Sequence, residues 1–131
     1  MAARRTEVRD AGLVEPEPFA SADEAWIWAM QGMLARLAGA RVKAGMARSP
    51  RPCEATDIIA CAYRLHRQAM LSRTEMEILF LYGRYAVAPY SLGKAHRAAT
   101  PVWRRAMCSL EQILEQKGII QPRTGEANRA Q

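Results

Sequence analysis

The chain has 131 residues, half of them hydrophobic, and a net charge of +6. This length fits one domain, and no stretch approaches the roughly 20 apolar residues that a membrane-spanning helix needs. The first residues lack the apolar run of a secretory signal, so we expect a cytoplasmic protein without a membrane partner. The charge is uneven, because residues 25–110 carry thirteen Lys or Arg and four acids, whereas residues 1–24 carry three Arg and six acids. A basic region of this kind attracts polyanions.

The two ends of the chain differ from its middle. Residues 1–20 are rich in charge and proline, and residues 121–131 are polar without apolar spacing. We expect a disordered leader, a single helical domain over residues 21–120, and a disordered tail. Three cysteines without a C-x-x-C pair argue against a disulfide framework and a zinc site. Cys61 and Cys108 have apolar neighbours and are predicted in the core, whereas Cys53 follows a proline and is predicted in an exposed loop.

The first predicted helix begins at a capping box, in which Ser21 is the N-cap and Glu24 the third helical residue. Apolar residues follow at helical spacing, and Gly39 weakens the helix end. Trp26 and Trp28 are two positions apart, so they cannot share one helix face. We expect Trp26 in the core and Trp28 at an interface with a protein partner or a second copy.

Two further helices follow a proline-containing break. The second is predicted from about residue 54 to residue 68, with acids in its first turn and basic residues near its end. The third begins at another capping box, Ser72 with Glu75, and is predicted to end at Gly83. The residues of the third helix expected to face the core are Met76, Leu79, Phe80 and Tyr82.

The last part of the domain is predicted as a short helix followed by a long one. Pro89 prevents a continuous helix over residues 86–99, and Ser91 is expected to cap a helix of two turns. The long helix covers residues 100–117, with Thr100 as N-cap, Pro101 as first residue and Gly118 at its end. The two isoleucines after it are expected to fold back on the core. No segment alternates with period two, so the fold class is all-α, a small bundle of four to five helices.

Catalytic chemistry finds little support in the sequence. The only histidines, His66 and His96, lie among basic residues, and neither has a carboxylate three or four positions away. No glycine-rich phosphate loop is present. We therefore expect a protein that is not an enzyme and that has no cofactor and no metal site.

The order of parts after residue 70 resembles the helix-turn-helix of sigma-factor region 4 and of related phage regulators. The motif Leu71-Ser72-Arg73-Thr74-Glu75 opens a helix, a short segment follows, and the last helix has a basic start. The resemblance covers residues 71–117. It implies a C-terminal helix-turn-helix-like unit whose last helix enters the major groove by its N-terminal end. The interval from Leu92 to Val102 is shorter than in that family, so a shortened support helix or turn is expected.

These observations predict a small DNA-binding or RNA-polymerase-associated transcription regulator. Helix N-termini favour phosphate, and arginine reaches both phosphates and guanine edges of double-stranded DNA. The alternative is a protein-interaction adaptor, or a structural subunit of a larger assembly, that binds no nucleic acid. The residues expected to contact DNA are Lys94, Arg97, Trp103, Arg104 and Arg105, with Arg73 and Arg84 as supporting backbone contacts.

Overall fold

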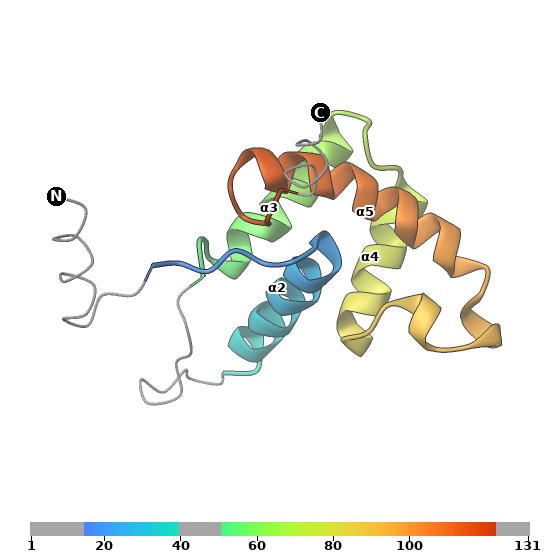
Figure 1. The fold of residues 1–131 in the computed structure, drawn as a ribbon. Coiled ribbons are helices and arrows are strands. Elements are labelled where there is room, and N and C mark those ends of the chain that lie inside the picture. Colours follow the sequence, from blue (N-terminus) through green and yellow to red (C-terminus); the bar gives the residue numbers. More distant parts are fainter. Residues whose placement is uncertain (1–14, 40–50, 123–131) are drawn as a thin grey trace, which may run out of the picture.

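The computed structural model describes residues 15–39 and 51–122. Regular structure within these ranges is helical, which confirms the predicted all-α class (Figure 1). None of these helices has the length and apolar character required to cross a membrane. The elements are the α-helices α2 (Ala22–Leu37), α3 (Ala55–Arg67), α4 (Arg73–Tyr85) and α5 (Ala99–Gln116), with the 3₁₀ helices η2 (Pro89–Ser91) and η3 (Lys94–His96) between the last two.

The first and third predicted helices begin at their capping residues. The Ser72 hydroxyl accepts the Glu75 amide at 3.1 Å, and the Glu75 carboxylate accepts the Ser72 amide at 2.8 Å. At α2 the Ser21 hydroxyl accepts the Glu24 amide at 3.2 Å, while the Glu24 carboxylate reaches one residue further back, to the Ala20 amide. Both caps satisfy amides that a helix leaves without an internal partner.

Three helices end in the same way. A residue in the left-handed conformation follows each one, Ala69 after α3, Ala86 after α4 and Gly118 after α5. The next amide then donates to a carbonyl five positions earlier, at 2.8, 3.3 and 2.9 Å. This is the Schellman arrangement, and it confirms Gly118 as the end of the last helix. The predicted end at Gly83 is wrong, because α4 continues to Tyr85.

Gly83 has a different role, at the crossing of α2 and α4. A side chain at this position would collide with Met30 and would lie 3.0 Å from Nε1 of Trp26. Trp26 is fully buried, and its Nε1 donates to the Leu79 carbonyl at 2.8 Å. Gln31 donates from its side chain to the Gly83 carbonyl at 3.0 Å. The glycine therefore allows the α4 backbone to approach α2 closely enough for these bonds.

The segments before α2 and after α5 meet in the core. Phe19 is fully buried, although the sequence places it in the leader. Its amide donates to the Ile119 carbonyl at 2.9 Å, and its carbonyl accepts the Gln121 amide at 2.8 Å. Ile119 and Ile120 are buried, as predicted. Phe19 thus packs with the core although it lies before residue 21, and burying one phenylalanine contributes about 1.5–3 kcal/mol.

Arg51 fastens this extended segment to α2. Its guanidinium lies 4.2 Å from the centre of the Phe19 ring and donates to the Glu17 carbonyl at 3.1 Å. It also forms an ion pair with Glu24 at 3.7 Å. The positive charge of Arg51 is therefore partly neutralised by Glu24 and does not belong to a free basic surface.

The short helix expected from Ser91 does not form. Two 3₁₀ helices of three residues each take its place, and Gly93, with a φ of +89°, separates them. Pro89 at the start and the left-handed glycine in the middle prevent the repeated α-helical hydrogen bonds. The helix-turn-helix-like unit is therefore not confirmed.

The start of α5 also differs from the prediction. The helix begins at Ala99, and its N-cap, Ala98, makes no side-chain capping bond. Thr100 lies inside the first turn, where its hydroxyl donates to the His96 carbonyl at 3.4 Å. Backbone bonds of the 3₁₀ type already wind the chain from residue 93 to residue 100, so the helix needs no capping side chain at Thr100.

Candidate nucleic-acid interface

Charge in the described residues is balanced overall but concentrated locally. Residues 15–39 and 51–122 contain eleven Lys or Arg and ten Asp or Glu. Between Glu77 and Glu111, however, the chain has five Lys or Arg and no acid. This stretch comprises the second half of α4, the connection with η2 and η3, and the first half of α5, which lie together at one end of the molecule (Figure 1).

Three contacts hold the connection between α4 and α5 against the rest of the fold. Pro89 is buried, with less than 2% of its surface exposed. The hydroxyl of the next residue, Tyr90, donates to Oδ2 of Asp23 at 3.0 Å. Further along, Nδ1 of His96 shares a hydrogen bond of 2.6 Å with the hydroxyl of Tyr82. The connection is therefore attached to α2 and to α4 near both of its ends.

Trp103 belongs to this anchoring and not to the surface. Its side chain is fully buried, and Nε1 donates to the same Asp23 oxygen at 2.8 Å. The residue shares the inward face of α5 with Ala106, Met107 and Leu110, which follow at helical spacing. The position of Trp103 corrects the expectation that its ring contacts DNA, because no part of the ring reaches the surface.

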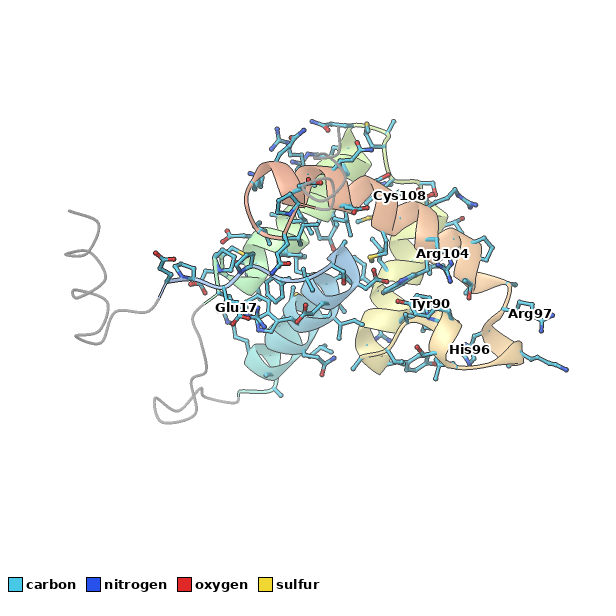
Figure 2. All side chains as sticks on the ribbon, viewed as in Figure 1. Glu17, Tyr90, His96, Arg97, Arg104 and Cys108 are labelled. Carbon is cyan, nitrogen blue, oxygen red and sulfur yellow. The ribbon has the colours of Figure 1, made fainter. Side chains whose placement is uncertain are left out.

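Four of the predicted contact residues are exposed at this end of the molecule, and we call them the basic end: Arg84, Lys94, Arg97 and Arg104. None of them forms an ion pair with a carboxylate of the described residues. The Arg104 guanidinium lies 4.9 Å from the centre of the Tyr90 ring. Figure 2 shows Tyr90, His96, Arg97 and Arg104 along the same side of the protein.

Arg73 and Arg105 are placed differently from the basic end. Arg105 pairs with Glu75 at 3.3 Å, and Arg73 pairs with Glu77 at 3.3 Å. Arg73 also lies at the start of α4, whereas Arg84 lies in its last turn, roughly 16 Å along the helix. An exposed pair such as that of Arg73 with Glu77 contributes only about 0–1 kcal/mol, so it opens readily. Even so, the charges of these two arginines are partly neutralised within the chain.

Asp23 and Tyr90 form part of the site that sequence reasoning missed. Asp23 lies in the first turn of α2, and Tyr90 lies between Pro89 and Ser91 in the connection. Their side chains meet although 67 positions separate them. Burial and the neighbouring Asp23 carboxylate raise the pKa of the Tyr90 phenol. No local sequence signal reports a contact of this range.

The histidines have partners of their own. His66 bonds through Nδ1 to the Leu71 carbonyl at 2.7 Å, and His96 bonds to Tyr82. In the part of the chain that the structure describes, no group of three or more His, Cys, Asp or Glu is arranged to hold a metal ion. The basic end itself offers exposed cations, and cations of this kind attract anions.

No protein-family model, curated protein or solved structure matches this chain. The assignment of a function consequently rests on the geometry of its own residues.

Proposed function

We propose that this protein binds double-stranded DNA through the basic end, mainly by contacts to phosphates. The observation that carries the proposal is the group of four exposed cations without an ion-pair partner in the described residues, in a stretch that contains no carboxylate. Contacts of Lys and Arg to phosphates release counterions and dominate the affinity of most DNA-binding proteins.

The anchoring of the connection favours such contacts. Lys94 belongs to η3, and Arg97 directly follows it. The bond of His96 to Tyr82 holds this turn on α4, so binding DNA requires little ordering of the backbone. Stacking over the Tyr90 ring restricts the Arg104 side chain in the same way.

The proposed mode of binding is to the DNA backbone and not to base edges. The connection consists of 3₁₀ turns, and Trp103 and Arg105 near the start of α5 are engaged within the protein. We therefore expect little dependence on DNA sequence. A role in transcription, with RNA polymerase as a further partner, extends the proposal and has the sequence resemblance over residues 71–117 as its support.

The experiment is a salt titration with a fluorescent random-sequence DNA duplex, using Lys94→Gln combined with Arg97→Gln. Each lost phosphate contact lowers the slope of log affinity against log salt by about 0.9. We expect the slope of the double variant to fall by about 2 and its affinity at low salt to fall at least about tenfold. Fluorescence anisotropy at four or more salt concentrations measures both values.

The matched control separates a local contact from a general loss of charge. Arg36 is an exposed cation in the last turn of α2, outside the basic end. Arg97→Gln alone should lower the slope by about 1, whereas Arg36→Gln removes the same charge and should leave it unchanged. Equal slopes for wild type and the Lys94 and Arg97 double variant would show that the basic end does not bind DNA.

The alternative function, a protein-interaction adaptor, was expected to use Trp28 as its contact. Trp28 is half-buried, and the centre of its ring lies 5.0 Å from that of Phe19. Much of its apolar surface is thus covered by the chain's own residues, and we do not place a protein interface on it.

A further inference from the structure

A hollow of about 510 Å³ lies at the other end of α5 from the basic end. Three segments form it: the residues before α3, the outer face of α3, and the turn after α5. Its volume falls within the range of about 300–1,000 Å³ typical of small-molecule sites. Since α5 has 18 residues, its two ends are roughly 27 Å apart, and the hollow is separate from the proposed DNA surface.

Three cations from two helices line this hollow. Arg64 and Arg67 come from the last turn of α3, and Lys117 follows the last residue of α5. None of the three forms an ion pair with a described carboxylate. The acid in the lining is Asp57, and its carboxylate accepts the Glu54 amide at 2.8 Å. The described residues of the lining therefore carry an excess of two positive charges.

Two of the cations act on a cysteine of the same lining. Burial raises the pKa of the Cys61 thiol, while the charges of Lys117 and Arg64 act in the opposite direction. Cys61, Arg64 and Lys117 all line the hollow, although Arg64 belongs to α3 and Lys117 follows α5. Basic residues at helix C-termini commonly offset the helix dipole, which explains their type. The dipole does not explain why the ends of two helices direct their cations at one hollow.

The rest of the lining is apolar or neutral. Pro52, Ala60 and Ile119 supply hydrocarbon surface. Cys53 adds a thiol whose pKa is raised to about 11, first by burial and then by Asp57, Cys61 and Glu54. At neutral pH this thiol is uncharged and does not offset the cations. The hollow thus combines a cationic side with an apolar side.

We propose that this hollow is a binding site for a small organic phosphate of about mononucleotide size. The phosphate would contact Arg64, Arg67 and Lys117, because a phosphomonoester carries about −1.5 to −2 charges near pH 7. The organic part would lie against the apolar lining. The site is independent of the DNA surface, so either proposal can fail without the other.

Cys53 and Cys108 allow a footprint of the hollow in the full chain. Cys53 lines the hollow, whereas Cys108 is exposed on α5 outside it. The protein is alkylated with N-ethylmaleimide at pH 8.5 in the presence of adenosine monophosphate, ribose 5-phosphate or adenosine, and each cysteine is followed by mass spectrometry. We expect both phosphates to slow the labelling of Cys53 at least threefold, adenosine to have no effect, and Cys108 to serve as the unaffected control.

A charge variant identifies the residues responsible. Arg64→Gln with Lys117→Gln should abolish the protection of Cys53 by both phosphates. Lys94→Gln with Arg97→Gln removes the same charge at the basic end. This variant should retain the protection of Cys53 by both phosphates. Protection by adenosine alone, no protection by any of the three compounds, or protection that persists in the Arg64 and Lys117 variant would overturn the proposal. Protection of Cys53 by duplex DNA in place of the small phosphates would also overturn it.

Discussion

The two regions that contact the second half of α4 are held in different ways. At the crossing with α2, the backbone of Gly83 lies against Met30 and Trp26 with no space for a further carbon atom. At the connection to α5, a few side-chain bonds to Asp23 and Tyr82 hold a segment that is otherwise largely exposed. The crossing is part of the core, whereas the connection presents cations to the solvent.

This difference separates stability from binding. Close packing makes the crossing sensitive to any added volume, because a core cannot yield without moving several side chains. The connection tolerates changes at its surface, since its cations make few contacts with the fold. Variants at the crossing should therefore alter the free energy of unfolding, and variants of the exposed cations should alter DNA affinity with little loss of stability.

The largest expected effect is that of Gly83→Ala. The new carbon collides with Met30 and lies 3.0 Å from Trp26 Nε1, so the bond from Trp26 to Leu79 is displaced. We expect the free energy of unfolding to fall by about 3 kcal/mol, the upper part of the range for overpacking. This fall is expected even though alanine favours a helix by about 1 kcal/mol relative to glycine. Urea denaturation followed by circular dichroism measures it.

Gly32→Ala is the matched control for this variant. Among the described residues, a Cβ at Gly32 would meet the Ala55 Cβ, at 3.3 Å. Gly32→Ala should change the free energy of unfolding by no more than about 1 kcal/mol, because the gain in helix propensity and the mild contact oppose each other. A Gly83→Ala protein as stable as wild type would show that the crossing is not closely packed.

A smaller loss is expected for Asp23→Ala, which tests how the connection is held. The variant leaves the buried Trp103 Nε1 without its acceptor and frees the Tyr90 hydroxyl. An unsatisfied buried donor costs about 1–3 kcal/mol, and we expect about 2 kcal/mol. Asp23→Asn removes the same charge but keeps an acceptor oxygen, so it should cost less than half as much. Equal losses for both variants in denaturation curves would assign the effect to charge.

The smallest expected effect is a gain in stability from Ala86→Gly. Ala86 has a φ of +65° at the start of the connection, a conformation that costs an L-residue about 1–2 kcal/mol. Glycine relieves this cost but is more flexible in the unfolded chain, so the net gain should be about 0.5–1 kcal/mol. Ala69→Gly, with a φ of +64° away from the connection, should give the same gain.

The DNA affinities of Ala86→Gly and Ala69→Gly test whether side chains or the backbone hold the connection in place. If side-chain anchors hold the connection, neither glycine should change the affinity by more than about twofold. A weaker affinity for Ala86→Gly alone would show that the backbone at Ala86, and not the anchors, positions the basic end.

Much of the helical pattern could be predicted because its signals are local. The capping residues Ser21 and Ser72 and the terminator Gly118 act within a few residues of their own helix ends, and each acts as expected. A prediction failed where the residues adjacent in sequence were used to place a side chain on a helix face. Cys108 was predicted in the core from its apolar neighbours, but the structure places it on the exposed face of α5.

The candidate site was predictable in composition and not in arrangement. The absence of acids between Glu77 and Glu111 is visible in the sequence, and so are the cations of the basic end. Which of the predicted contact residues are engaged within the protein depends on α2 and on the start of α4, because Asp23 accepts from Trp103 and Glu75 pairs with Arg105. Such contacts join residues far apart in the chain and leave no periodic signal.

The sequence by itself determined the helical class, most helix boundaries and the location of the positive charge, because hydrophobic spacing, capping and charge are properties of neighbouring residues. Only the tertiary structure decided that Gly83 is a packing contact, that Phe19 belongs to the core, and that Trp103 is an anchor and not a surface residue. Each of these depends on the approach of two segments, and that approach is set by how the whole core packs together.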